Sequence, residues 1–214
     1  MTDTTLQPTD VRLTFALAVR TGTEVVAGVT PDVLDRPTPC DDMDVRSLTA
    51  HLVAVLERVA ALGRGEDPFA VAEPVAADDA WPERWARAAH AVQEAWTDDA
   101  VLGRPMSLPW QQGTGADILG GYVSEVTVHT WDLARALGVQ PEWHPRPVEA
   151  ALAGVDGFLP ATGRFELFER ISAEMSLDEV AVPFRDAVPV ADDAPAIDRL
   201  VAWNGRDPHW APPR

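Results

Sequence analysis

A carboxylate and an imidazole lie four residues apart in the segment from Glu125 to His129. If this segment is helical, four residues correspond to ~400° of rotation, so the two side chains lie ~40° apart on one face. The neighbouring residues Tyr122, Val126 and Leu133 make this the apolar face of the helix. A buried carboxylate needs a compensating partner, because an unpaired charge inside a protein is costly. The spacing therefore indicates either two ligands of a metal ion or a Glu–His hydrogen bond at the edge of a helical bundle.

A second histidine, His51, lies on the apolar stripe of another predicted helix, next to Leu48 and Leu52. With Glu125 and His129 it forms a set of two histidines and one carboxylate. Such a set holds a divalent transition metal through three protein ligands and leaves at least one position open for water or a substrate. The same groups could also satisfy one another without a metal, as a buried His–Glu–His hydrogen-bond cluster. Both interpretations stay open from the residues alone, and no further catalytic residue is assigned.

Asp132 follows Glu125 by seven residues and falls on the same helix face. It could orient a histidine ligand by accepting a hydrogen bond from the ring nitrogen that faces away from the metal. It could instead form an ion pair with Arg135, three residues further along the helix surface. From the sequence we favour the surface ion pair.

The other histidines and the single cysteine are given structural interpretations. His90 lies off the apolar stripe of its predicted helix, and surface positions are expected for it and for the loop residues His144 and His209. Cys40 precedes a predicted helix, where the helix dipole lowers the pKa of a thiol. No His or Asp partner is recognisable for it, so a structural role is expected.

Eight tryptophans are many for a chain of this length. Their rings offer aromatic surface to a ligand when they are not part of the core. Trp85, Trp110 and Trp131 are candidates for pocket walls, although core packing is the expected role of each.

Four long segments show the apolar periodicity of amphipathic helices, and proline-bearing segments join them. Thr9 or Asp10 can cap the first segment, Asp44 the second, and Asp78 or Asp79 the third. This pattern predicts an all-α protein built on a four-helix bundle. A short hairpin is expected at 104–110, before the fourth segment. The predicted helices cover residues 10–29, 45–63, 78–96 and 115–137.

The chain beyond residue 140 is less regular. Residues 177–190 alternate in polarity, but Pro183 and Pro189 argue against a central strand. We expect one domain, 1–214, in which the bundle of residues 1–140 carries an extension, 141–214, packed on it. Short helices are expected in this extension at residues 148–159, 165–175 and 195–203.

The charge of the chain disfavours two classes of partner. Its 214 residues carry 34 acidic and 17 basic side chains, and all the basic ones are arginine. A surface this acidic repels phosphate groups, so neither nucleic acid nor a membrane is expected as a partner. No apolar run is long enough for a transmembrane helix, and the N-terminus lacks the regions of a signal peptide. These features predict a soluble cytoplasmic protein, as a monomer or homodimer.

Two segments together resemble one protein family. Residues 40–52, CDDMDVRSLTAHL, and residues 125–134, EVTVHTWDLA, look like the N-terminal domain of the mycothiol-dependent maleylpyruvate isomerase, one of the DinB-like metal-binding bundles. The closing segments 193–200 and 205–208 resemble the ends of uncharacterised actinobacterial members. The resemblance implies that His51, Glu125 and His129 are metal ligands. It also implies Zn²⁺ as the usual metal, with Ni²⁺ or Fe²⁺ in relatives, and mycothiol as cosubstrate.

The resemblance supports metal binding by this chain more strongly than it supports the reaction of the isomerase. The isomerase has a separate C-terminal domain, whereas the residues after Leu137 are too few and too irregular for a full copy. No thiol-binding residue of the isomerase outside the metal ligands can be matched to this chain.

Three functions remain from the sequence. The leading hypothesis is a transferase or isomerase of the mycothiol-dependent type, in which the open metal position lowers the pKa of a small-molecule thiol for attack on an electrophilic substrate. The first alternative is a non-catalytic metal-binding or sensing protein. The second is a metal-dependent hydrolase, for which the sequence offers only Asp132 or an unassigned glutamate as the base.

Overall fold

The computed structural model of the chain describes residues 10–40, 43–72, 74, 80–156, 160–174 and 185–212. Within these residues the chain is mostly helical, and its only sheet is a two-stranded hairpin, so the predicted all-α class is confirmed. None of the helices in these ranges combines the length and apolar character needed to span a membrane. The elements are α1 (Val11–Val26), η1 (Pro31–Val33), α2 (Val45–Arg64), η2 (Pro68–Ala70), α3 (Trp81–Ala95), α4 (Asp99–Gly103), β1 (Pro105–Leu108), β2 (Gln111–Thr114), α5 (Gly115–Leu137), α6 (Pro145–Asp156), α7 (Arg164–Glu174) and α8 (Ala196–Trp203).

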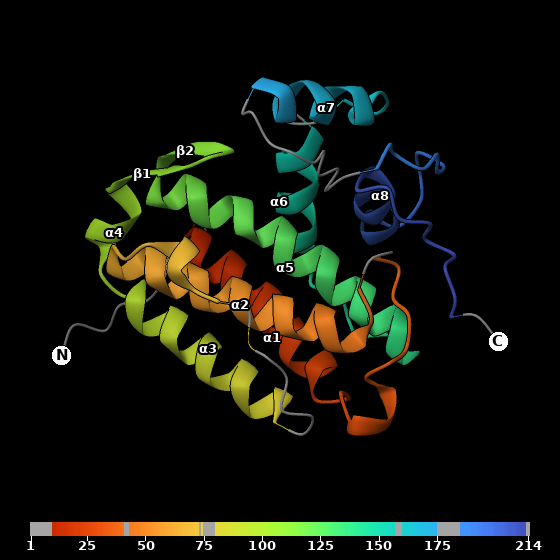
Figure 1. Ribbon diagram of the computed structural model, residues 1–214, viewed down its shortest axis with the longest axis horizontal. Coiled ribbons are helices and arrows are strands. Elements are labelled where there is room, and N and C mark those ends of the chain that lie inside the picture. The colour runs from red at the N-terminus through yellow and green to blue at the C-terminus, as the bar shows by residue number, and fades with distance from the viewer. Residues whose placement is uncertain are drawn as a thin grey trace.

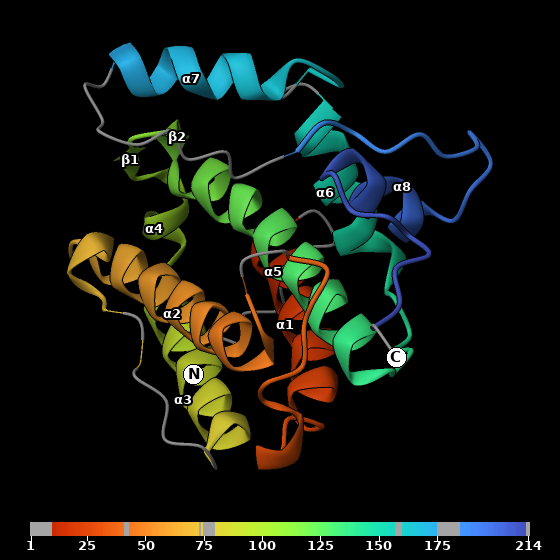
Figure 2. The ribbon, with the colours of Figure 1, turned by 45° about the vertical axis from the view of Figure 1, so that its right-hand side comes forward.

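The four long helices α1, α2, α3 and α5 pack together as the predicted bundle (Figure 1, Figure 2). Helix α2 contacts α3 and α5, and α1 contacts α5 and α3. Leu52 and Leu56 of α2, Trp85 of α3 and Val126 of α5 are almost completely buried between them. Full burial of an apolar side chain of this kind contributes about 1.5–3 kcal/mol. The packing therefore directs the apolar faces of α2 and α5 toward a common interior.

Local signals set the ends of the bundle helices. Asp10 accepts a hydrogen bond from the backbone N–H of Arg12, and Asp44 accepts one from that of Ser47, both at 2.8 Å, so the predicted caps of the first two helices are confirmed. Helix α5 begins in a capping box between Thr114 and Asp117. These caps hold the start and the rotation of each helix.

Several sequence predictions fall outside the described residues. They are the N-cap candidates Thr9, Asp78 and Asp79, the last residues of the helices predicted at 148–159 and 165–175, and most of the alternating segment 177–190. Residues 185–190 are described and have no regular structure.

The hairpin lies further along the chain than predicted. It pairs β1 with β2, with Leu108 opposite Gln111, and so covers residues 105–114. The short helix α4 before it was not predicted. Core packing for Trp110 is wrong, because this residue lies at the hairpin turn with 54% of its surface exposed. Its ring meets that of Phe69 edge to face, with 5.9 Å between the ring centroids.

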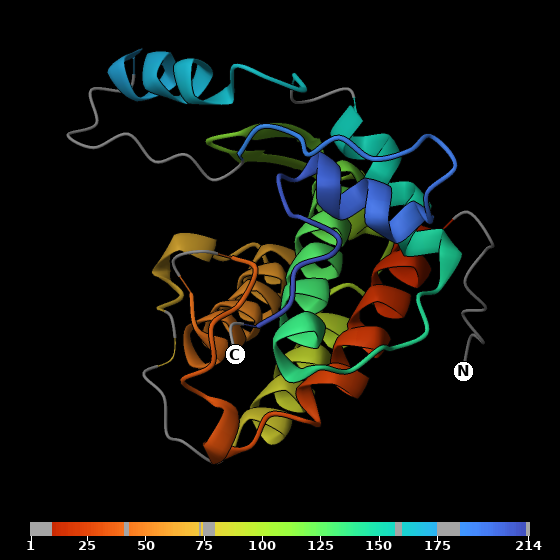
Figure 3. The same ribbon diagram turned by 90° about the vertical axis from the view of Figure 1, so that its right-hand side faces the viewer.

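The C-terminal extension contributes short helices, as predicted, and two of them lie against the bundle. Helix α6 contacts α5 and α1, and α8 contacts α6 and α5 (Figure 3). Helix α6 begins at Pro145, three residues before the predicted start, and Pro195 caps α8 instead of opening it. Arg164, at the start of α7, donates hydrogen bonds to the carbonyl groups of Arg185 and Trp203. In the C-terminal half of α5, Arg135 and Asp132 also bind Trp210 and Arg206 of the chain after α8.

A close approach at Gly22 predicts a stability effect. A Cβ atom at this buried position of α1 would lie 2.5 Å from the ring of Trp85, which is held by its hydrogen bond to Thr23. We expect Gly22→Ala to lower the free energy of unfolding by about 1–3 kcal/mol, as overpacking does. Gly120→Ala is the matched control, because its nearest neighbour would be Val11 at 3.9 Å. This control should gain up to about 1 kcal/mol from helix propensity. Urea unfolding of both variants measures the difference, and equal behaviour would contradict the prediction.

Candidate metal centre

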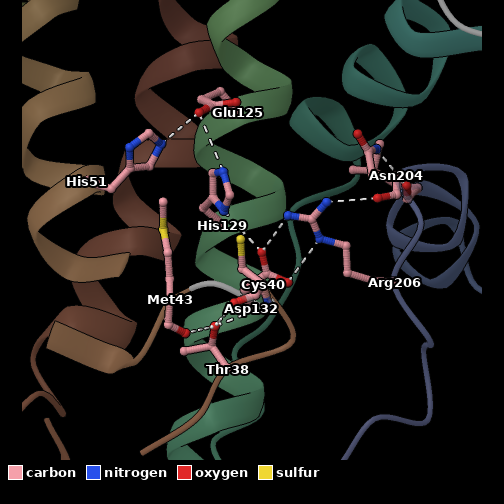
Figure 4. A network of polar contacts seen from close by, with 10 residues as sticks. Thr38, Cys40, Met43, His51, Glu125, His129, Asp132, Asn204 and Arg206 are labelled. Atoms are coloured by element: carbon pink, nitrogen blue, oxygen red, sulfur yellow. Dashed lines mark hydrogen bonds and ion pairs between the residues drawn. The ribbon is translucent and has the colours of Figure 1, made fainter. Parts of the chain in front are cut away.

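The structure brings His51, Glu125 and His129 together between two bundle helices. His51 projects from α2, and Glu125 and His129 project from neighbouring turns of α5 (Figure 4). The three side chains point toward one another, and the side chain of Met43 reaches toward the two imidazoles from the loop before α2. The helical spacing of α5 and the inward stripe of α2 therefore place these residues on facing surfaces, as the sequence predicts.

The distances show that the donor atoms converge on one point. The Nε2 atom of His51 lies 2.9 Å from Oε1 of Glu125, and Nε2 of His129 lies 3.5 Å from the same oxygen. One ligand atom from each of the three residues lies within 4.8 Å of the others. Ligand atoms about 2.1 Å from a tetrahedral ion are about 3.4 Å from one another. The residues present thus fit a divalent cation held by two imidazole nitrogens and one carboxylate oxygen.

The centre is shielded from solvent but not closed. The side chains of His51 and His129 are 15% and 12% exposed, and that of Glu125 is 31% exposed. Within the described part of the chain, no fourth His, Cys, Asp or Glu joins this set. Three ligands and a partly exposed carboxylate are the features of a site that can accept a further ligand.

The electrostatics of the centre couple Glu125 to His129. Burial is the largest influence on Glu125 and opposes its charge, but His129 and His51 together hold its pKa well below the usual value. Burial likewise opposes a charge on His129, whereas Glu125 and Asp132 raise the pKa of this imidazole to about 9. Without a metal, the centre is therefore a carboxylate–imidazolium pair at neutral pH.

The raised pKa of His129 predicts how the metal-free protein responds to pH. The folded-state pKa of about 9 lies above the ordinary value of 6.5. The protonated imidazole therefore contributes stability that is fully present below about pH 6.5 and is lost as the pH rises through about 9. We expect the free energy of unfolding to fall by something on the order of 3 kcal/mol across this window. Urea unfolding at each end of the window measures the change, and His129→Ala should remove it.

Asp132 lies on the other side of His129 and is fully buried. Its Oδ2 atom lies 3.1 Å from Nδ1 of His129 and 3.1 Å from Nη2 of Arg206. The ion pair predicted between Asp132 and Arg135 is wrong, because the Arg135 guanidinium instead donates to the backbone carbonyl of Trp210. The alternative interpretation, a carboxylate that orients a histidine, matches the observed contacts. The partner of Asp132 could not be found from helix spacing, because Arg206 lies 74 residues away.

Cys40, His129 and Asp132 form a second set of nearby ligand atoms, again within 4.8 Å of one another. The sequence offered Cys40 no recognisable partner, since both neighbours are distant along the chain. The guanidinium of Arg206 already binds the carboxylate of this set, and its positive charge opposes a cation there. The set of His51, Glu125 and His129 is therefore the better candidate for a metal.

The structure also tests the positions predicted for the other histidines and for two tryptophans. His90 and His209 are exposed, as predicted, whereas His144 is half-buried and accepts a hydrogen bond from the backbone N–H of Arg146. Trp85 is buried in the core, as expected. Trp131 is also buried, but it lies outside the main apolar core and lines a cavity, so its role as a pocket wall is the one that the structure supports.

A separate cavity of about 240 Å³ lies between the end of α5, the loop after it, α8 and the C-terminal segment. Trp131, Trp143 and Arg135 contribute to its walls, and none of the three candidate metal ligands does. The cavity is thus not part of the metal centre.

Comparison with known proteins places the chain in a family. Residues 15–134 match the model of the mycothiol maleylpyruvate isomerase N-terminal domain, which is more than half of the chain. The chain belongs to this family. The segment matched to the mycothiol maleylpyruvate isomerase N-terminal domain contains His51, Glu125, His129 and Asp132, whereas Arg206 lies outside it.

The chain is also similar to uncharacterized proteins of two strains of Mycobacterium tuberculosis. Each is 27% identical to it over 186 residues, which cover 85% of this chain and 90% of the relative. No solved structure shows a significant match. The relatives therefore extend the similarity beyond the mycothiol maleylpyruvate isomerase N-terminal domain into the C-terminal extension.

Proposed function

We propose that this chain is a cytoplasmic, metal-dependent transferase or isomerase that uses a low-molecular-weight thiol of the mycothiol type. His51, Glu125 and His129 hold the metal. Zinc is the metal that we propose first, and nickel and iron are the alternatives. The observation that carries the proposal is the convergence of two Nε2 atoms on one carboxylate oxygen, in a chain of the mycothiol-associated family.

The contacts of His129 support a metal over a simple hydrogen-bond cluster. Asp132 occupies the Nδ1 side of the ring, which leaves Nε2 directed at Glu125 and His51. A carboxylate behind a histidine is the usual arrangement around protein-bound metals, because it fixes the tautomer and makes the facing nitrogen a better ligand. Glu125 stays ionised in this environment, so it offers a charged oxygen to a cation.

The ligand set also favours a thiol as the additional ligand. A divalent cation supplies Lewis acidity that lowers the pKa of a thiol and yields a nucleophile at neutral pH. Glu125 is the one anionic residue of the set, so a single positive charge is left to attract an anionic ligand such as a thiolate. The partly exposed side of Glu125 gives this ligand a route from solvent.

The contacts of Asp132 argue against this residue as the base of the hydrolase alternative. A hydrolase needs a general base with access to water near the open position. Asp132 is fully buried and pairs with Arg206, so it has no such access. The non-catalytic alternative is separated from the enzyme by experiment.

The proposal is tested on protein purified without an affinity tag or added metal. Elemental analysis should find close to one equivalent of a divalent metal, and less than about a third of an equivalent would contradict metal binding. Mycothiol is then titrated into the cobalt-substituted protein while its visible spectrum is followed. We expect a new sulfur-to-cobalt absorption band at millimolar thiol. If the protein binds metal but the cobalt spectrum does not change when mycothiol is added, the thiol-dependent enzyme is contradicted and the non-catalytic metal-binding protein is favoured.

A further inference from the structure

The C-terminal segment reaches the metal centre through one arginine. Arg206 places Nη2 3.1 Å from Oδ2 of Asp132 and Nε 3.3 Å from Oδ1, so both carboxylate oxygens are engaged (Figure 4). The same Oδ2 atom lies 3.1 Å from Nδ1 of His129. Arg206, Asp132 and His129 thus form a continuous chain of contacts that ends at a proposed metal ligand.

The backbone after α8 is shaped to deliver this arginine. Gly205 has a φ of 79°, which favours glycine, and a Cβ atom there would lie 2.7 Å from the Cβ of Arg185. The next residue is then held by a hydrogen bond from the backbone N–H of Arg206 to the carbonyl of Val201. Its Nη1 atom also donates to the carbonyl of Asn204 at 2.8 Å. The guanidinium is therefore fixed by its own segment as well as by Asp132.

The ion pair between Arg206 and Asp132 is expected to act more by orienting the Asp132 carboxylate than by adding to the stability of the fold. Asp132 is fully buried, and the Arg206 side chain is 10% exposed. The desolvation cost of so buried a pair offsets most of its attraction, so a pair of this kind adds little net stability over an apolar pair. Two hydrogen bonds to one carboxylate do, however, fix its plane. The plane of the Asp132 carboxylate sets the direction of the hydrogen bond that Oδ2 accepts from Nδ1 of His129. It therefore also sets the direction in which Nε2 of His129 points.

We infer that Arg206 is a positioning residue of the metal centre: through Asp132 it holds His129 in the orientation that binds metal. The inference rests on the proposed function. It assigns the C-terminal segment, outside the matched family domain, a role in setting the metal affinity of the bundle. By linkage, metal binding in turn stabilises the docked C-terminal segment to the same extent.

The test compares Arg206→Gln with a matched control, Arg199→Gln, on the exposed surface of α8. Zinc affinity is measured by competition with a chelator. We expect Arg206→Gln to weaken zinc binding about tenfold, at the lower end of what the loss of a ligand-orienting partner costs. The control should stay within about twofold of the unmodified protein, which is the usual outcome for a surface substitution. Arg206→Lys keeps the charge and one hydrogen bond, so it should recover part of the loss.

A second measurement on the metal-free proteins keeps the two proposals apart. Nitrogen NMR of the histidine side chains reports the hydrogen bond between Nδ1 of His129 and Asp132, and we expect its protected proton signal to be lost in Arg206→Gln only. Loss of the signal in a protein that binds no zinc would overturn the proposed function while supporting the orientation by Arg206. Zinc binding that is equal in Arg206→Gln and Arg199→Gln would overturn the inference and leave the proposed function intact.

Discussion

Replacing His129 with alanine is expected to reduce metal affinity by more than 100-fold. Loss of a partner that only orients a ligand costs about 10–100-fold, and loss of the ligand atom itself should exceed this. The remaining pair, His51 and Glu125, offers one nitrogen and one carboxylate, which is too few for a stable zinc site. Metal content after purification and chelator competition both measure the effect.

Two further variants make the result interpretable. His90→Ala removes an exposed histidine that pairs only loosely with Glu94, at 3.4 Å, and should leave metal binding unchanged. Glu125→Gln keeps the shape of the side chain but removes its charge, so it should lower metal affinity without disturbing the packing of α5. If His129→Ala retains the metal, His129 is not a ligand. If neither it nor the unmodified protein binds metal, the three residues are a hydrogen-bond cluster.

Replacing Asp132 with alanine is expected to cost about 3–5 kcal/mol of the free energy of unfolding, because breaking a buried ion pair leaves its partner uncompensated. Arg206 would keep a positive charge in a position where 10% of its side chain is exposed. His129 would lose its contact on the Nδ1 side as well. Urea unfolding of the metal-free protein measures the loss without any contribution from metal binding.

The comparison for Asp132 uses one conservative and one surface variant. Asp132→Asn keeps the size and one acceptor oxygen, so it should cost less than Asp132→Ala. Asp193→Ala removes a carboxylate from an exposed position and should change stability by less than about 0.5 kcal/mol. A loss for Asp132→Ala no larger than that for Asp193→Ala would mean that the buried pair with Arg206 does not form in solution.

Local patterns predicted the parts of this protein that depend on local physics. The period of apolar residues predicts a helix over 115–137, where the structure has α5, and predicts that Glu125 and His129 face α2, where they meet His51. Asp44 was recognised as a cap because a helix start leaves backbone N–H groups that need an acceptor. The approach of His51 to Glu125 followed from two such stripes that share one core.

Contacts made by the C-terminal segment were not predictable in this way. Asp132 and Arg135 have the spacing of a helical ion pair, yet each binds a residue of that segment, Arg206 and Trp210 respectively. The path of an irregular segment depends on tertiary packing, which leaves no periodic trace in the sequence. The same reason explains Cys40, which lies beside His129 and Asp132 although neither is near it in the chain.

The parts of the metal centre are synthesised in a fixed order, because its contacts join residues that lie far apart along the chain. His51 is separated from Glu125 by 74 residues, and Asp132 is separated from Arg206 by the same number. At a synthesis rate of about 5–20 residues per second, each interval takes about 4–15 seconds. A nascent chain therefore carries all three proposed ligands well before Arg206 emerges from the ribosome. We therefore expect the bundle to bind metal with low affinity at first, and with higher affinity once the C-terminal segment that carries Arg206 has docked.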